Sequence, residues 1–522
     1  MSFNLTSEFN FSTNHSKLVR ETSDRKAGFG KLPLVILIVF SGLIAVDRLV
    51  VPQVPFNVDP ATYAVVSHEL LQGKSLYTDI WDHKPPAIFV TYELAELAFG
   101  YSPQTLVILN ILISLVALFG IYWAGKTGPG GVVSGLLAAA LWLILSGTFQ
   151  LEGRDPNTEP FLNACMIWAF ALLARYQTDG LKPQTSIIIG LLFVIGTFFK
   201  PIIAAAAVGL VCAHVLFSPN KKQAVKSTLL IGTVGAVGWL ALFGYFAATD
   251  RFEVFYKAIV SYNRFYSGNM LANIVAPLRD GTELIPDFMN PLAIVAVVGV
   301  VLAFISNRRQ GALLAAFIGS SWIAIALPGR FSVHYFQLWL PSLIVGACWA
   351  IGFFAATEGF RFKMVSYVVG GLLFGTLIFS QVSTYKTVFA NEWFPAIRVL
   401  NAGEGTADRI NGLLVPDETF FLWGSTPSLY LLSGRRPPAP VLFNSHFDES
   451  PVSEQLTKRA MSDLARNRPE LLIVEKGRSP VPTWIAQDYE STPIYHDKDS
   501  YTFYARRGGR LAQQVNSPSI EK

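Results

Sequence analysis

The fold is decided by long apolar runs, and the clearest of them, residues 185–217, reads TSIIIGLLFVIGTFFKPIIAAAAVGLVCAHVLF. A helix needs about 20 apolar residues to cross the ~30 Å core of a bilayer, because each residue adds about 1.5 Å. This run is too long for one crossing. Lys200 and Pro201 in its middle predict a tight turn between two helices, because an unpaired ammonium group and a proline are both costly inside a membrane.

Similar apolar runs, some of them short, recur along the chain. They lie at 32–51, 104–123, 129–149, 160–176, 185–199, 201–217, 227–247, 290–306, 311–327, 336–356 and 364–382. The composition agrees, since 52% of the residues are hydrophobic and only 15% are charged, whereas about a quarter are charged in soluble proteins. The sequence therefore predicts an α-helical polytopic membrane protein with about eleven transmembrane helices.

The basic residues predict the orientation, because cytoplasmic loops are enriched in Lys and Arg. With a cytoplasmic N-terminus, the inner connections hold Lys17, Arg20, Arg25, Lys26 and Lys31, then Lys126, Arg175, Lys182, Lys221, Lys222, Lys226, Arg308, Arg309, Arg361 and Lys363. Residues 1–31, rich in Ser, Asn, Thr and charge, form a predicted disordered cytoplasmic tail. The transmembrane domain spans 32–382, and an odd number of helices places 383–522 outside.

Three outer segments are large enough to carry a site: 52–103, 248–289 and 383–522. The last alternates helix-like and strand-like stretches. These are helices at 395–413 and 450–466 and strands at 418–423, 470–475 and 501–506. We expect a small extracytoplasmic α/β domain with parallel strands.

The first outer loop holds the most informative polar residues. Asp59 followed by Pro60 is typical of the start of a helix, which Gly73 would close. Asp59 and Tyr63 would then lie one turn apart on the same face. Asp59 could serve only as a helix cap, or it could also act as a base where the chain leaves the membrane surface.

Lys84 is followed by two prolines, which hold the backbone extended and fix the position of its ammonium group. It could bind a phosphate or could be an interfacial lysine that extends to the membrane surface. The neighbouring His83, with Asp79 and Asp82 close by, could hold a phosphate, a divalent cation or both, although a single histidine is more often structural.

Two further outer loops add charged groups. The loop at 150–160 carries Asp155 and Glu159, which could form an acidic wall for sugar hydroxyls or a metal, or could belong to a solvated turn that starts a helix.

Lys200 and the loop at 328–335, with Arg330, His334 and Tyr335, complete the set. Lys200 and Arg330 could clamp a phosphate, or each could anchor the chain at the interface, as Tyr335 could. The predicted topology places all these residues on one side of the membrane. Unrelated structural roles for each residue would not require this clustering.

These residues carry a resemblance to a known family. The first outer loop, from Asp59-Pro-Ala-Thr-Tyr63 through Tyr77-x-Asp79 to Lys84-Pro85-Pro86, resembles that of GT-C glycosyltransferases of family 39, which include protein O-mannosyltransferases and lipid A aminoarabinose transferases. Bacterial members are also similar at Asn157-Thr-Glu159-Pro160-Phe161, Phe199-Lys200-Pro201, Arg330-x-x-x-His334-Tyr335 and Trp423-Gly424-Ser-Thr-Pro427-x-x-Tyr430.

The resemblance implies a polyprenyl-phosphate sugar donor, a catalytic acid in the first loop and inversion at the anomeric carbon. Asp59 would be the general base and Lys84 a contact to the donor phosphate. Lys200, Arg330 and His334 would be further phosphate contacts. Tyr63, Asp155, Glu159 and Tyr335 would contact the sugar or the acceptor.

Two departures from the family pattern concern the acids. The family often has Asp-Glu where this chain has Asp59-Pro60, so the partner carboxylate is missing or comes from Asp155 or Glu159. In the aminoarabinose branch an acid that takes part in metal binding precedes the lysine, and here that position is His83. A divalent metal held by His83, Asp155 and Glu159 is therefore an option, and no cofactor is required.

The predicted function is an integral-membrane glycosyltransferase that moves a sugar to an acceptor hydroxyl on a glycan, lipid or protein at the extracytoplasmic face. Its expected location is the bacterial inner membrane, with the site toward the periplasm. Alternatives are a transporter or flippase of lipid-linked sugar and a non-catalytic partner of a glycosylation complex. A nucleic-acid partner is not expected, because the net charge of +5 forms no basic patch interleaved with aromatics.

Overall fold

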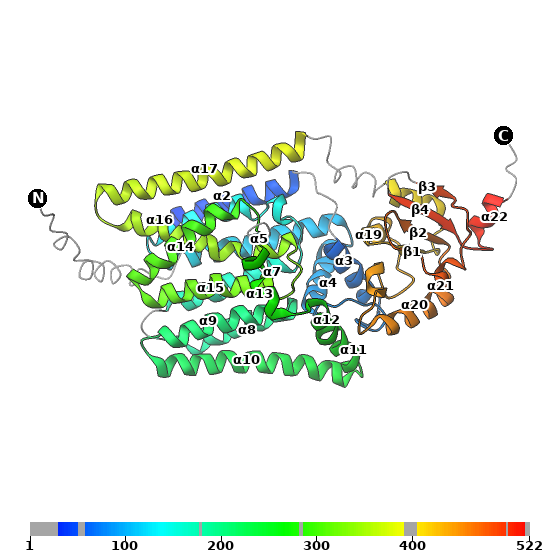
Figure 1. Ribbon diagram of the computed structural model, residues 1–522, viewed down its shortest axis with the longest axis horizontal. Helices are drawn as coiled ribbons and strands as arrows, with labels where there is room; N and C mark the ends of the chain where they lie inside the picture. The colour runs from blue at the N-terminus through cyan, green and yellow to red at the C-terminus, as the bar shows by residue number, and fades with distance from the viewer. Residues whose placement is uncertain are drawn as a thin grey trace, which may run out of the picture.

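A computed structural model of the chain describes residues 30–50, 58–176, 180–280, 285–390, 405–496 and 500–516. The predicted cytoplasmic tail therefore lies almost wholly outside the described residues. Long helices run side by side in one bundle, and a small domain containing a β-sheet lies at one end of it (Figure 1).

Each predicted apolar run coincides with a helix of the bundle. These helices are α2 (Lys31–Val50), α5 (Pro103–Lys126), α6 (Val132–Leu145), α7 (Thr158–Arg175), α8 (Pro183–Phe199), α9 (Ile203–Phe217), α10 (Lys221–Ala248), α14 (Met289–Ser306), α15 (Arg308–Ala326), α16 (Leu340–Ala356) and α17 (Phe360–Ala390). Among the described residues, seven helical stretches are long and apolar enough to cross a membrane, and α6, α8 and α9 are shorter apolar helices. The chain is thus a polytopic helical membrane protein, while the number of crossings stays a prediction.

The predicted turn at Lys200 is confirmed, because α8 ends at Phe199 and α9 begins at Ile203. Two boundaries differ from the prediction. Helix α17 continues to Ala390, past the predicted end at 382. Helix α6 is shorter than predicted, since Gly130 and Gly131 precede it with positive φ angles and the short 3-10 helix η1 (Phe149–Leu151) follows it.

Small residues allow the helices of the bundle to pack closely. A Cβ atom added to Gly299 of α14 would lie 1.9 Å from the carbonyl oxygen of Gly346 in α16. Close backbone approach at small residues replaces the hydrophobic driving force that helices lack inside a membrane.

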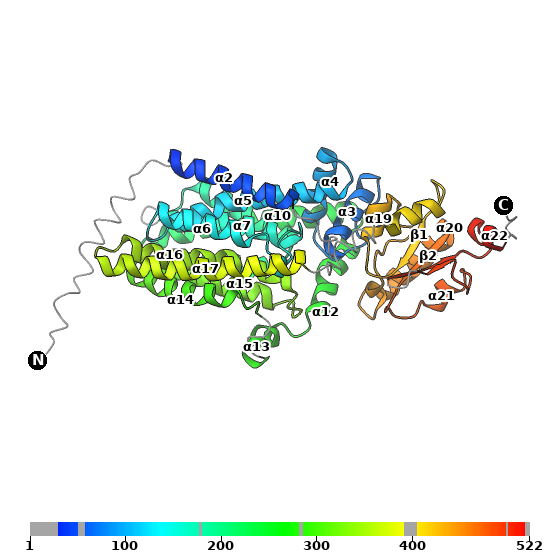
Figure 2. The same ribbon diagram turned by 90° about the horizontal axis from the view of Figure 1, so that it is seen from above.

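The loops predicted to lie outside gather at the end of the bundle that carries the small domain (Figures 1 and 2). They contain α3 (Val58–Leu71), α4 (Ala87–Phe99), α11 (Phe252–Tyr256), the π-helix η2 (Lys257–Tyr262), α12 (Asn263–Ser267), α13 (Met270–Asp280) and the 3-10 helix η4 (Val333–Leu338). Helices α3, α4, α11 and α12 lie between the bundle and the small domain, whereas α13 stands apart from the bundle in Figure 2.

The C-terminal domain is built on a four-stranded sheet with the order β1-β2-β4-β3. Its strands are β1 (Phe420–Trp423), β2 (Leu471–Glu475), β3 (Tyr495–His496) and β4 (Tyr501–Ala505), and its helices include α19 (Ser428–Ser433), α20 (Ser453–Asn467), α21 (Thr483–Ala486) and α22 (Arg510–Asn516). The predicted small α/β domain is therefore present, and α20 lies at its predicted place.

The expectation of parallel strands holds for only one pair. Strands β1 and β2 are parallel, but β4 runs antiparallel to both β2 and β3. Strand β3 ends at His496 and β4 begins at Tyr501, a separation in sequence that suits an antiparallel pair, whereas a parallel pair needs a long crossover connection.

Candidate active site

Asp59 and Lys84 meet at the end of the bundle. The Lys84 Nζ atom lies 3.6 Å from a carboxylate oxygen of Asp59, and their side chains are 8% and 30% exposed. Asp59 lies in the first turn of α3, which already includes Val58, so it is not the cap residue that was predicted. Gly73 follows α3 with a positive φ angle, as expected for the residue that closes the helix.

The loop before α4 holds Lys84 at several atoms. Its backbone N–H donates to Asp82 at 2.7 Å, and its carbonyl accepts a hydrogen bond from the Tyr77 hydroxyl at 2.8 Å. The Nε2 atom of His83 lies 3.1 Å from Nζ of Lys84. The amide of Asn263, in the second outer loop, donates to the His83 carbonyl at 2.9 Å. The ammonium group is thus fixed by contacts at both ends of the residue.

The charges of this pair support each other. Burial alone would raise the pKa of Asp59, but Lys84, His334 and His83 together hold this pKa well below its usual value. Burial would lower the pKa of Lys84, yet Asp59 and Asp82 raise it overall. At neutral pH, Asp59 is therefore a carboxylate and Lys84 an ammonium ion. Asp82 differs, because burial outweighs Lys84 and raises its pKa to about 6.

A second ion pair lies close to the first. Lys200 Nζ is 2.8 Å from a carboxylate oxygen of the buried Glu159 and 3.8 Å from the centre of the Tyr335 ring. Asn157 caps α7, which starts next to Glu159, and accepts a hydrogen bond from the Tyr63 hydroxyl at 3.3 Å. Lys200 therefore has a carboxylate partner in this site, and its contact with a phosphate stays a prediction.

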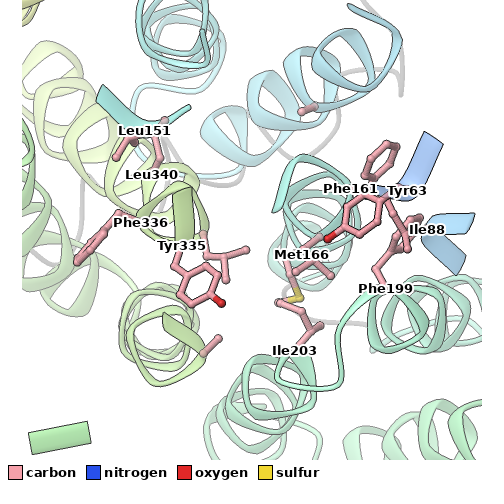
Figure 3. Packing of buried hydrophobic residues seen from close by; sticks show 14 of the residues in the cluster. Tyr63, Ile88, Leu151, Phe161, Met166, Phe199, Ile203, Tyr335, Phe336 and Leu340 are labelled. Atoms are coloured by element: carbon pink, nitrogen blue, oxygen red, sulfur yellow. The ribbon is translucent and has the colours of Figure 1, made fainter. Parts of the chain in front are cut away.

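Aromatic side chains support both ion pairs. Figure 3 shows Tyr63 beside Phe161 and Phe199, with Tyr335 across from them. The rings of Phe161 and Phe199 stack with their centres 4.9 Å apart. This packing fixes the starts of α3 and α7 and the end of α8, which carry Asp59, Glu159 and Lys200.

His334, Arg330 and Asp155 lie around these pairs. His334 Nδ1 is 2.9 Å from a carboxylate oxygen of Glu152. Arg330 is exposed, donates to the Tyr266 carbonyl at 3.1 Å and lies over that ring. Asp155 is buried. Burial, followed by the charges of Asp155 and Asp59, raises the pKa of Tyr92. The structure therefore places every predicted site residue in the same region.

Backbone strain marks the same loops. Tyr77, Glu152 and Phe331 have φ angles of 70°, 53° and 46°, a region that bulky residues rarely adopt. Each such residue costs on the order of 1–3 kcal/mol and is typical of functional sites.

The predicted metal ligands do not come together. Across the described ranges of the chain, no three His, Cys, Asp or Glu side chains form a group that could hold a metal ion. Glu159 instead pairs with Lys200, and His83 lies beside Lys84. The set of His83, Asp155 and Glu159 is therefore not assembled, and metal dependence stays a prediction.

Several residues of this region were not among the predicted site residues. Glu152, Asn157, Asn263 and Tyr266 all bond to predicted site residues. The C-terminal domain adds His446, which is 2% exposed and lies with its ring centre 4.5 Å from that of Trp81. No local pattern surrounds His446, so only the three-dimensional structure reveals its place.

Comparison with solved structures identifies the fold. ArnT from Cupriavidus metallidurans bound to undecaprenyl phosphate has a TM-score of 0.60 and 13% identity, with 90% of this chain and 97% of that chain covered. The structure of the same protein in the apo state has a TM-score of 0.60 and 12% identity, with 90% of this chain and 97% of that chain covered. The archaeal oligosaccharyltransferase AglB from Archaeoglobus fulgidus, in complex with an inhibitory peptide and a dolichol-phosphate, has a TM-score of 0.52 and 11% identity. The match covers 85% of this chain and 69% of that chain.

These structural neighbours are GT-C glycosyltransferases, which confirms the predicted GT-C type of fold. No protein-family model and no curated protein matches the sequence.

Proposed function

We propose that this protein is an integral-membrane glycosyltransferase that moves a sugar from a polyprenyl-phosphate carrier to an acceptor hydroxyl. The observation that carries the proposal is the Asp59–Lys84 pair, held at the end of a GT-C bundle with a separation of 3.6 Å. The pair provides a base and a cation side by side, and the reaction needs both. The proposed location is the cell membrane, with the site on the extracytoplasmic side, which is the periplasm in a bacterium.

The proposed reaction is a single displacement. The acceptor oxygen attacks the anomeric carbon from the face opposite the phosphate, so a new C–O bond forms as the bond to the phosphate oxygen breaks. Asp59 takes the proton of the attacking hydroxyl. The carrier phosphate leaves with the bonding electrons, and the Lys84 ammonium stabilises its growing charge. The sugar is transferred with inversion.

The electrostatics of the pair suit this sequence of events. In the free site Lys84 lowers the pKa of Asp59, which makes the carboxylate a weak base. An anionic phosphate bound to Lys84 offsets this effect, so the pKa of Asp59 rises when the donor is in place. The base therefore becomes stronger when the donor is bound.

Other residues take proposed supporting roles. Arg330 is exposed, and its proposed role is to bind the incoming carrier phosphate through two hydrogen bonds from its guanidinium group. Lys200, already paired with Glu159, and His334 add positive potential around the phosphate. Tyr63, Tyr335, Asp155 and Glu159 form the proposed wall for the sugar and the acceptor, which is a lipid, a glycan or a protein.

A flippase would use the same phosphate contacts without a base and would need polar groups across both halves of the bundle. In the other half, Arg309 lies 3.1 Å from His214, which lies 3.1 Å from Ser227. Arg309 also donates to the Leu173 carbonyl. These groups bond to one another, which favours a structural role over a transport path.

The test is the profile of glycolipids and glycans in a deletion strain that expresses the wild type, Asp59→Asn or the matched surface control Asp488→Asn. We expect the wild type and the control to restore the missing sugar, and Asp59→Asn to leave it missing at normal protein levels. Transfer near the wild-type level by Asp59→Asn would refute the role of Asp59 as a base. The same result would favour a flippase, which needs no base.

A further inference from the structure

The C-terminal domain is fastened to the first outer loop around the candidate site. Arg436 donates two hydrogen bonds to the buried Glu69 of α3, at 2.9 and 2.8 Å. The backbone N–H of Trp81 donates to the Pro440 carbonyl at 2.9 Å, and Arg459 contacts Asp79 at 3.2 Å. The segment 436–446 is thus held against the loop that carries Lys84.

Within this segment, His446 is buried among rings from three parts of the chain. Its ring centre lies 4.5 Å from Trp81, 6.0 Å from Tyr262 and 6.0 Å from His83, at nearly right angles to each. The ring of Phe443, from the same segment, lies with its centre 3.9 Å away. His446 therefore fills the space between the C-terminal domain and His83.

The backbone around His446 is itself fixed. The N–H of Asn444 donates to the Gly424 carbonyl, which directly follows β1, at 2.9 Å. The Asn444 side chain contacts Ser425 and Ser479, both at 3.3 Å. The end of the parallel strand pair thus holds His446 in place, as a rigid element can hold a site residue.

His83 links this ring to the ion pair, because its Nε2 atom lies 3.1 Å from the Lys84 ammonium. Lys84 is protonated beside Asp59, so His83 must accept at Nε2, and its proton lies on Nδ1. In the described structure both buried Nδ1 atoms, of His83 and of His446, have no hydrogen-bond partner. Burial, followed by Lys84, lowers the pKa of His446 to about 3. The imidazole of His83 therefore lies beside the ammonium, and the neutral imidazole of His446 lies next to His83.

We propose that His446 is a positioning residue of the transfer site, through which the C-terminal domain holds His83 against the Lys84 ammonium and shields that ammonium from water. The inference deepens the proposed function, since Lys84 is there the phosphate contact. It makes the C-terminal domain a part of the site and not only an appendage to the bundle.

The test measures the reactivity of Lys84 in the full-length protein, which needs no substrate. A brief pulse of an amine-reactive acylating reagent is followed by peptide mass spectrometry, with Lys458, whose side chain is 74% exposed, as the internal reference. We expect His446→Ala to raise the labelling rate of Lys84 relative to Lys458 about ten-fold, because the ring that holds His83 is gone. His446→Phe, which keeps a ring, should stay within about two-fold of the wild type.

Two comparisons separate positioning from general loosening. His496→Ala, which alters an exposed histidine of the same domain, should match the wild type. His83→Ala should raise Lys84 labelling as much as His446→Ala, and the double variant should add nothing further, because the two residues act in series. Thermal melting of each variant shows that it is folded, and His446→Asn replaces His446→Ala if the latter is not.

The outcomes are decisive in both directions. Unchanged Lys84 labelling in His446→Ala, a uniform rise at all lysines, or additive effects in the double variant would each overturn the proposal. Binding of undecaprenyl phosphate, used as the probe of carrier affinity, should weaken about ten-fold in His446→Ala and recover in His446→Phe. If binding is absent even in the wild type while labelling behaves as expected, the proposed function fails and the positioning role stands.

Discussion

Asp59→Asn should bind the carrier phosphate more tightly than the wild type while losing transfer. In the free protein the Asp59 carboxylate lies 3.6 Å from the Lys84 ammonium, so it competes with an incoming phosphate for this cation and repels it. Two unit charges at that distance interact by ~5 kcal/mol at an effective dielectric constant of 20. Asp59 is 30% exposed, so screening by water reduces this figure to about 1–2 kcal/mol, which corresponds to about 5–30-fold in affinity.

The assay is titration of purified protein in nanodiscs with undecaprenyl phosphate, followed by tryptophan fluorescence or thermophoresis. Asp488→Asn, a change at an exposed surface position, controls for the general loss of one negative charge. Tighter binding by Asp59→Asn alone supports direct competition at Lys84. Equal or weaker binding by Asp59→Asn would refute the reasoning, because Lys84 would then not be the phosphate contact.

The remaining predictions concern charge, pH and packing. Lys84→Met should weaken the binding of undecaprenyl phosphate by about 10–100-fold in the same titration, because a charge-assisted hydrogen bond contributes about 1.5–3 kcal/mol. Asp82 has a pKa raised to about 6, so the folded state binds its proton more tightly than the unfolded state does. Its contribution to stability is therefore full below about pH 4 and is lost as the pH rises to about 6, and melting temperatures of the wild type and Asp82→Asn should differ by an amount that changes across this window. Gly299→Ala should lower the free energy of unfolding by about 1–3 kcal/mol, because its Cβ would lie 1.9 Å from the Gly346 carbonyl oxygen.

Each of these has a matched control. Lys257→Met, at a half-exposed lysine paired with Glu253, should leave carrier binding unchanged, and a similar loss there would deny Lys84 a special role. A flat difference between the wild type and Asp82→Asn from pH 4 to 6 would show that the pKa of Asp82 is not raised in the folded protein. Gly371→Ala, where no atom lies within 4 Å of the added Cβ, should melt like the wild type.

The bundle could be predicted because its signals are local. Transmembrane helices can be recognised from the length and apolarity of a segment alone. The turn at Lys200-Pro201 lies where two residues that are unfavourable inside a membrane interrupt an apolar run. The meeting of Asp59 with Lys84 was also within reach, since both lie in one outer loop. The ends of α6 and α17 were not, because glycine conformation at the start of α6 and polar residues at the end of α17 give weaker signals than an apolar run does.

The missed features depend on residues far apart in the sequence. Glu152 reaches His334 across 182 positions, and Asn263 reaches His83 across 180, and neither contact leaves a trace in the local pattern. The pairing of Lys200 with Glu159 has the same origin and explains why two predicted ligands proved to be partners of each other. The antiparallel β4 escaped prediction because strand direction is set by the connection and not by the composition of the strand.

Helix α3 carries Asp59 near its start and Glu69 near its end, about 15 Å apart at 1.5 Å per residue. Asp59, the proposed base, and Glu69, the partner of Arg436, therefore lie at the two ends of one helix. In a chimaera that exchanged the C-terminal domain with that of another protein of this fold, the incoming domain would have to fit helix α3, so residues 58–86 would need to be exchanged together with 436–446. The residues that must be kept together for the proposed site to stay intact therefore belong to both the bundle and the C-terminal domain.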